Sequence, residues 1–426
     1  MSQKKIEGAL PLLILPLLIL DDRIFLLACI AVFVYLMIRN NNAVMLIPLL
    51  LIFTESNPIA LPGLDLTLSK WGFAFLLLIY LRKRPKFSFS PVFIPISVFL
   101  GGFLLWTAVA ADAVILRWTV TMTANILFFF LVFQLLKDKQ MQKQIVRGLL
   151  FALVINASLG IFQFISGGRT LLYFGMNNEK MCFEHWGDFV RSSGLFQNTN
   201  LFVSFLIPLC LILFPLIKKK HRYLFIPVIF GVLFTFSRGA WVAVIAALMI
   251  FLLRRGKKYF PLLIPIILLI LFTPFGQRFY RKAQDHSVYY SDMGRKASFE
   301  VGAEFISRNI YTGSGPGKFY TEFARYAPDN LPWSNFYPHN AFIAALGETG
   351  ITGFFSLLAI FYILLAALAK EKRRPGLHWM MGSIFSLFIL SNFYDLHTEP
   401  QFWIIVAIAA GIQHFEPGRK ISVFPL

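Results

Sequence analysis

The sequence predicts an all-α polytopic membrane protein with about 12–14 transmembrane helices and two longer loops on the outer face. Three observations lead to this class. Of the 426 residues, 57% are hydrophobic and 14% charged, with a mean hydropathy of +0.68, which is more apolar than a soluble protein of this length. Apolar runs such as VFIPISVFLGGFLLWTAVA are long enough to cross a bilayer. The basic runs RKRPK, KKKHR, RRGKK and KEKRRP fall between spans on one side, as the positive-inside rule predicts.

The net charge of +19 records orientation rather than affinity for nucleic acid. With the amino terminus inside, the positive excess lies in cytoplasmic segments and the outer segments are close to neutral, so both termini are expected in the cytoplasm. The basic face can attract anionic membrane lipid without specificity. The first apolar run, ALPLLILPLLIL, leads into DDR without a small-residue cleavage site, so no cleavable signal peptide is expected. The cysteines and histidines lack metal-ligand spacing, so neither a metal nor a cofactor is expected.

Hydropathy divides the chain into alternating membrane and loop regions. The expected order is amino-terminal helices in 1–166, an outer loop in 167–198, helices in 199–273, a large outer loop in 274–340 and carboxy-terminal helices in 341–426. The individual spans are roughly 8–20, 24–38, 43–54, 66–81, 91–110, 115–136, 144–166, 199–217, 222–236, 239–253, 259–273, 341–369, 377–394 and 401–414.

The larger outer loop has two recognisable segments. Residues Ser298 to Asn309 are predicted to form an amphipathic helix, whose apolar side would carry Phe299, Val301, Phe305 and Ile306. The stretch TGSGPGKF is turn-rich. Its glycines resemble those of a phosphate loop, but no Lys-Ser/Thr pair follows them, so a tight turn is the better interpretation. Because the inner loops are short, any chemistry is expected on the outer face.

Arg238 separates two apolar runs in FTFSRGAWVAVIAAL. An arginine near the middle of a membrane costs ~2.5–3.5 kcal/mol unless it has a partner or a watery cavity. One interpretation is an arginine that snorkels to the interface. The other is an anion-binding arginine at the start of a helix, which Ser237 could cap and where Gly239 lets a ligand approach the backbone. A guanidinium beside a helix N-terminus suits a pyrophosphate.

Two further cations lie in the outer loops. Arg191 precedes the polar run SSGLFQNTN, in which Asn198 or Thr199 could cap the next membrane helix. It is either a solvated loop arginine or a second cation over the outer cavity. Arg295 leads the amphipathic segment in SDMGRKASFE, and spacing alone favours a solvated charge there.

The stretch PHNAFIAALGETG contains His339, Asn340 and Glu348. His339 comes just before a helix that is expected to begin near Asn340, and the positive end of that helix favours a neutral ring. The pair is either a simple helix cap or a base with an orienting partner. Glu348 lies nine residues on, about 2.5 turns, and so on another face than His339. It is interpreted as structural support among glycines that permit close helix packing.

Together these motifs resemble the O-antigen ligase / Wzy polymerase family of integral membrane glycosyltransferases. The resemblance rests on RSSGLFQNTN, FSRGAW, GRKASFEVGAEFISRNIYTGSGPGKF and PHNAFIAALGETGITG, in that order, and covers roughly residues 185–370.

The resemblance implies a GT-C-like helical fold in the bacterial cytoplasmic membrane and a metal-independent, inverting transfer on its outer face. The donor would be an undecaprenyl-pyrophosphate-linked glycan, and the acceptor a glycan or lipid. It implies a donor pyrophosphate near Arg191, Arg238 and Arg295, and a catalytic part for His339. An O-antigen ligase and a polymerase of O-antigen, capsule, exopolysaccharide or teichuronic acid share these features. A transporter of lipid-linked sugar is the rival class, but the polar groups gather at the outer mouths of the helices and no two halves of the chain match.

Overall fold

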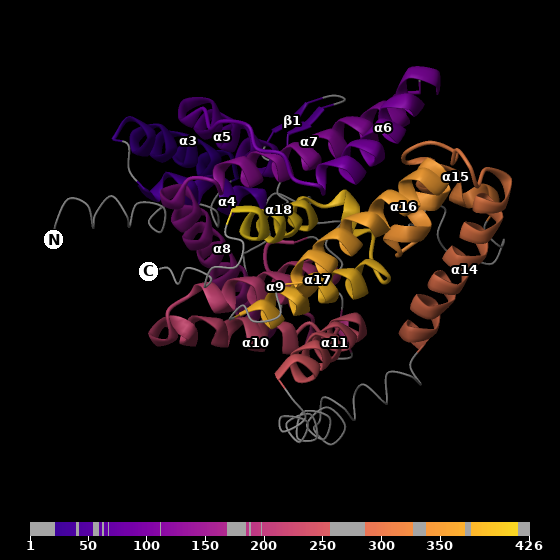
Figure 1. Ribbon diagram of the computed structural model, residues 1–426. Coiled ribbons are helices and arrows are strands. Elements are labelled where there is room, and N and C mark those ends of the chain that lie inside the picture. Colours follow the sequence, from indigo (N-terminus) through magenta and orange to yellow (C-terminus); the bar gives the residue numbers. More distant parts are fainter. Residues whose placement is uncertain are drawn as a thin grey trace. The chain divides into compact units, whose positions relative to one another are not determined.

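The structure, a computed structural model, describes residues 22–39, 42–53, 59–61, 64–66, 68–110, 112–167, 185–186, 189–196, 198–255, 286–326, 338–370 and 376–415. Most of these residues are helical (Figure 1). The α-helices are α3 (Asp22–Ile38), α4 (Leu46–Ile52), α5 (Leu68–Lys83), α6 (Phe93–Ala110), α7 (Ala113–Leu135), α8 (Lys139–Ile165), α9 (Thr199–Leu213), α10 (Ile226–Leu233), α11 (Arg238–Arg255), α14 (His286–Arg308), α15 (Lys318–Tyr326), α16 (Ala341–Lys370), α17 (Leu377–Ser391) and α18 (Pro400–Phe415). The 3-10 helices are η1 (Asn42–Met45), η2 (Phe214–Leu216), η3 (Lys219–Phe225) and η5 (Leu396–Thr398).

Within the described ranges, five helical segments are long and apolar enough to cross a membrane: α6, α7, α8, α16, and α9 continued by η2. The part of α16 that follows a kink at Gly350, residues 351–370, has a length of about 30 Å, enough to cross the hydrocarbon core. These helices confirm the all-α polytopic membrane class. The expected spans at 8–20 and 259–273 lie outside the described residues.

Two expected spans differ in the structure. Residues 43–54 form η1 followed by α4, which has seven residues, and α10 in the 222–236 stretch has eight. A helix of eight residues is about 12 Å long and does not reach across a hydrocarbon core of about 30 Å. The preceding part of this stretch is the 3-10 helix η3, and a proline at the start of α10 interrupts the hydrogen bonding that a continuous α-helix needs.

The chain divides into two compact units, of which the first comprises Met1–Ser88, Phe130–Ser237 and Phe415–Leu426. In this unit α4 packs against both α5 and α8. A Cβ atom at Gly72 of α5 would lie 2.7 Å from the Pro48 carbonyl oxygen, and one at Gly148 of α8 would lie 2.6 Å from Leu49 Cδ1. The two glycines therefore let both helices approach α4 closely. The apolar run that resembles a span in the sequence is instead a short helix buried in protein.

The second unit comprises Phe89–Phe129 and Arg238–His414. In it α11 and α17 run antiparallel: Gly239 at the start of α11 lies against Phe393 and Tyr394, just beyond the end of α17. At the other end, the rings of Phe251 and His378 are 4.9 Å apart. α16 also packs on α17, through Phe342 and other aromatic rings. The chain therefore brings the start of α11, the end of α17 and the start of α16 to one end of this unit.

The expected amphipathic helix is part of the longer α14, and its buried face differs from the prediction. Ala297, Val301 and Phe305 are buried and pack against Phe319 and Phe323 of α15. Phe299, which was expected on the apolar side, is 49% exposed. The spacing of the buried residues follows i, i+4 and i+8, a single stripe that leaves position 299 on another side of the helix.

Two short antiparallel hairpins occur in the loop regions. β1 (Ile59–Leu61) pairs with β2 (Leu64–Leu66), and β3 (His185–Trp186) pairs with β4 (Phe189–Val190). β3 and β4 belong to the 167–198 loop. Hydropathy predicts neither hairpin, because strands of two or three residues carry almost no periodic signal.

The turn of the larger loop is hydrogen-bonded to a kink in α16. Gly350 has φ 70° and ψ −163°, outside helical values. The carbonyls of Gly347 and Glu348 accept hydrogen bonds from the backbone N–H groups of Ser314 and Gly315, each at 2.9 Å, and the Ile351 N–H donates to Ile310 O. The turn therefore satisfies backbone groups that an unbroken helix would pair internally.

Gly350→Ala is expected to lower the free energy of unfolding by about 2–4 kcal/mol, because the added Cβ meets the Tyr311 carbonyl and because positive φ disfavours alanine. Thermal unfolding of the detergent-solubilised protein measures the loss. Gly101→Ala in α6 is the matched control, since no atom lies within 4 Å of the added Cβ. Equal unfolding midpoints for the two variants would contradict the steric role of Gly350.

Candidate active site

The first part of the candidate site is the start of α16. The side-chain oxygen of Asn340 accepts hydrogen bonds from the N–H groups of Phe342, at 2.9 Å, and Ile343, at 3.1 Å. Asn340 is therefore the N-cap, as the sequence predicts. His339 directly precedes it, half-buried, with a φ of 47°. Histidine is among the non-glycine residues that adopt this region more readily than most.

Asp395 holds this helix start in place. It lies in the segment Asn392–Asp395, which connects α17 to η5. Its carboxylate accepts hydrogen bonds from the backbone N–H groups of His339 and of Asn340, the latter at 3.0 Å. The Asn340 side-chain amide donates to the Asn392 carbonyl at 3.3 Å. The segment Asn392–Asp395 is thus bonded to both residues of the HN pair.

Arg238 lies at the same segment. It is exposed and is the first residue of α11. A Cβ atom at the next residue, Gly239, would be 2.9 Å from the Tyr394 hydroxyl oxygen, so only glycine allows this approach without a shift. Arg238 and His339 each immediately precede a residue that contacts Asn392–Asp395. The residues that directly follow Arg238 and His339 in the sequence therefore both contact one short segment.

Arg191 and Ser237 belong to the first unit, where they join two of the sequence motifs. The Arg191 Nε–H donates to the Thr235 carbonyl at 2.7 Å. The Ser237 hydroxyl donates to Asn200 Oδ1 at 3.5 Å. Asn198 caps α9 through the N–H groups of Asn200 and Leu201, which confirms it over Thr199 as the N-cap. Arg191 therefore contacts the turn that ends three residues before Arg238 in the sequence.

Glu348 lies eight residues beyond Asn340 in α16, close enough to Asp395 for the two side chains to interact electrostatically. Its side chain is buried within α16 and accepts backbone hydrogen bonds from Gly317 and Phe319. These N–H groups lie at the N-terminus of α15, where a carboxylate is favourable. The sequence does not reveal these partners, because the N–H donors come from a distant loop.

Two further candidates are Arg295, which the sequence predicts, and the buried His397. Arg295 lies within α14, but its side chain is outside the described residues. His397 is 1% exposed, and neither ring nitrogen has a hydrogen-bond partner among the residues described. Burial lowers the pKa of His397 to about 3, so this ring stays neutral and has no access to an acceptor in solvent. His339 is the better candidate base.

Asp395 is the site residue that sequence reasoning missed. The local sequence NFYDLHTEP contains no motif, and the partner Asn340 lies 55 residues away. The signal that could have found it is an acidic residue in a short connection between two apolar helices. Burial raises the pKa of Asp395 to about 7, against the opposing effect of the two N–H donors.

Asp395→Asn is expected to remove a pH dependence of stability. An unfolded aspartate releases its proton near pH 3.8, whereas folded Asp395 keeps it up to about pH 7. The stability that this group contributes is complete below the unfolded value and is lost as the pH rises through the folded one. In scanning calorimetry, the unfolding midpoint of the variant should therefore rise relative to that of the wild type as the pH increases from about 5 to about 8. Parallel pH profiles would contradict it.

The fold and the charged helix starts define a polytopic α-helical membrane protein with a polar site at one end of its second unit. Residues 223–358, roughly a third of the chain, match the family model described as O-antigen ligase. This part of the chain is similar to the O-antigen ligase family, which confirms the resemblance over these residues. No curated protein matches the chain. The matched range includes Arg238, Arg295 and His339, whereas Arg191 and Asp395 lie outside it.

Proposed function

We propose that the protein transfers glycan from an undecaprenyl-pyrophosphate donor to an acceptor hydroxyl on the outer face of the bacterial cytoplasmic membrane, as an O-antigen ligase-type glycosyltransferase. One observation carries the proposal. The segment Asn392–Asp395 contacts both Gly239 and Asn340, and these residues directly follow Arg238 at the start of α11 and His339 at the start of α16. A cation for pyrophosphate and a base for a hydroxyl are the groups that this transfer needs.

The residues account for both halves of the reaction. The acceptor oxygen forms a bond to the anomeric carbon while the bond from that carbon to the pyrophosphate oxygen breaks, with inversion. The hydroxyl proton passes to the neutral imidazole of His339. Negative charge grows on the departing pyrophosphate, and the guanidinium groups of Arg238 and Arg295 stabilise it together with the N-terminus of α11.

This chemistry needs no metal, because arginine supplies the positive charge. The test is to incubate the purified protein with synthetic undecaprenyl-pyrophosphate glycan and candidate acceptors, with and without EDTA, and to follow release of undecaprenyl pyrophosphate. Acceptor-dependent release that EDTA does not change would support the proposal. Release that requires an added divalent cation would contradict the metal-independent step.

The polymerase is the second candidate, because it uses the same donor and the same cations. A ligase transfers glycan to its acceptor in single additions, whereas a polymerase extends another lipid-linked unit into a ladder of products. Electrophoresis of the products from the same assay separates the two. A lipid-linked sugar transporter would instead move the donor across a vesicle membrane without releasing pyrophosphate lipid.

A further inference from the structure

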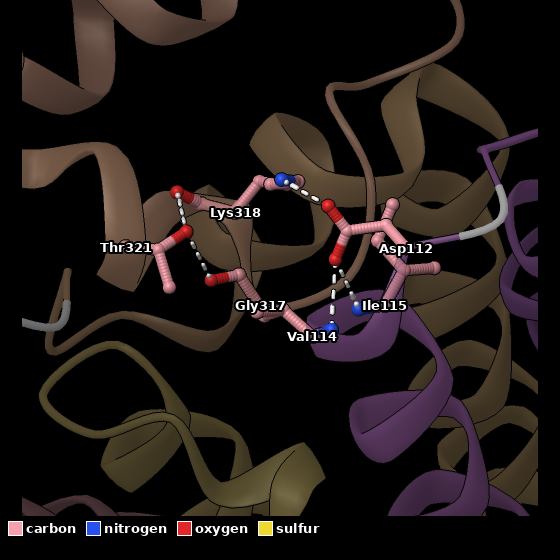
Figure 2. Close-up of polar contacts among 6 residues, drawn as sticks. All are labelled: Asp112, Val114, Ile115, Gly317, Lys318 and Thr321. Atoms are coloured by element: carbon pink, nitrogen blue, oxygen red, sulfur yellow. Dashed lines mark hydrogen bonds and ion pairs between the residues drawn. The ribbon is translucent and has the colours of Figure 1, made fainter.

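An ion pair joins the larger loop to the start of α7 (Figure 2). Lys318, the first residue of α15, places its Nζ 2.7 Å from Asp112 Oδ2, and the two side chains are 22% and 29% exposed. A cation at a helix N-terminus interacts unfavourably with the helix dipole. The charge of Lys318 therefore does not stabilise α15. The hydrogen bond from Lys318 holds the pKa of Asp112 below its usual range, so this carboxylate stays charged at neutral pH.

The same carboxylate also caps α7. Asp112 Oδ1 accepts hydrogen bonds from the N–H groups of Val114, at 2.7 Å, and Ile115, at 3.3 Å. One aspartate therefore connects the N-termini of two helices that lie 206 residues apart in sequence. The Thr321 hydroxyl donates to the carbonyls of Gly317 and Lys318, within the first turn of α15 (Figure 2).

The turn beside the pair fits α7 closely. A Cβ at Gly315 would lie 2.8 Å from Ile115 Cδ1, and one at Gly317 would overlap the Trp118 indole. Both glycines have positive φ. The Trp106 indole N–H donates to the Thr312 carbonyl at 2.8 Å. The ion pair is thus one of several attachments, and its loss is expected to loosen the loop without unfolding the protein.

The residue after Lys318 packs against α14. Phe319, the next residue, packs edge-to-face on Phe305 with ring centroids 5.4 Å apart. Phe319 and Phe323 share a buried cluster with Ala297, Val301 and Phe305 of α14. Arg295 is two residues from Ala297 on this helix. α14 therefore packs against α15, and also against α16, where Gly302 lies against Ile343; Lys318 is one of the residues that attach α15 to α7.

We propose that Asp112 and Lys318 are positioning residues, which latch α15 to α7 and thereby set the place of α14 in donor binding. The inference rests on the proposed function through the role of Arg295, although the latch itself does not. It predicts a specific effect on the lipid-linked donor, whereas an ordinary surface ion pair would affect neither donor affinity nor the dynamics of α14.

Hydrogen exchange and transfer kinetics on the full-length protein test the latch. The variants are Asp112→Asn, which keeps an oxygen to cap α7, Lys318→Met, and both together. Each single variant should speed amide exchange in residues 311–326 by about threefold to tenfold. The double variant should exchange no faster than either single one, because both remove the same interaction. The KM for donor should rise by a similar factor with kcat nearly unchanged, and Lys318→Arg should restore it.

Arg308→Met is the matched control, since it breaks an exposed pair with Glu304 inside α14, at 2.7 Å, that joins nothing to α7. Wild-type exchange in Lys318→Met, or additive effects of the two single variants, would overturn the latch. Faster exchange with an unchanged donor KM would overturn the positioning role. Exchange is measured without substrate, so the absence of transfer by the wild type would overturn the proposed function while the latch is still tested.

Discussion

Replacing Arg238 by alanine is expected to lower the rate of glycan transfer by about 10²–10³-fold, the cost of removing one group that stabilises a developing anion. Arg238 is exposed at the first position of α11. There its guanidinium adds to the partial positive charge of the helix N-terminus. Because pyrophosphate carries charge before and after departure, we expect both a higher donor KM and a lower kcat, measured as initial rates of undecaprenyl-pyrophosphate release.

Two variants sharpen the test of Arg238. The substitution Arg238→Lys keeps the positive charge but loses the bidentate geometry of the guanidinium, and it should restore only part of the rate. Arg82→Ala removes an exposed arginine from the end of α5, which the charge pattern predicts to be cytoplasmic, and should leave transfer unchanged. Full activity of Arg238→Ala would contradict a role in pyrophosphate binding. It would favour the alternative interpretation, an arginine that snorkels to the membrane interface.

Much of the fold could be predicted because hydropathy is a property of contiguous residues. The helices α6, α7, α8, α9 and α16 fall close to the expected spans. The caps Asn198 and Asn340 were also predictable, since a cap acts on N–H groups two or three residues away. The left-handed φ values of Gly313, Gly315 and Gly317 confirm the turn in TGSGPGKF.

What the sequence could not reveal depends on partners far apart in the chain. α4 resembles a membrane span, and only its packing between α5 and α8 shows that it is buried in protein. Asp395 has no motif of its own and gains its role from the backbone of His339 and Asn340. Lys318 and Asp112 are ordinary loop charges until the fold brings them to 2.7 Å. Spacing within one stretch carries no information on such pairs.

His339→Asn is expected to lower kcat by about 10²–10⁴-fold with little change in donor KM, because the ring is proposed to act on the acceptor proton and not on the pyrophosphate. Asparagine is a better replacement than alanine at this position. His339 has a φ of 47°, a conformation that asparagine tolerates well and alanine tolerates poorly. The backbone N–H that Asp395 binds is retained, so the variant removes the imidazole while leaving the start of α16 in place.

The pattern of kinetic effects separates a base from a cap. If the HN pair only begins a helix, His339→Asn should keep near-wild-type transfer, because Asn340 alone makes the capping bonds to Phe342 and Ile343. Asn340→Ala would then be the damaging change, through a cap loss of about 1 kcal/mol that lowers the unfolding midpoint. If His339 is the base, its variant unfolds at the wild-type midpoint and fails only in kcat. Because Arg238→Ala changes donor KM as well, the two substitutions distinguish activation of the acceptor from stabilisation of the leaving group.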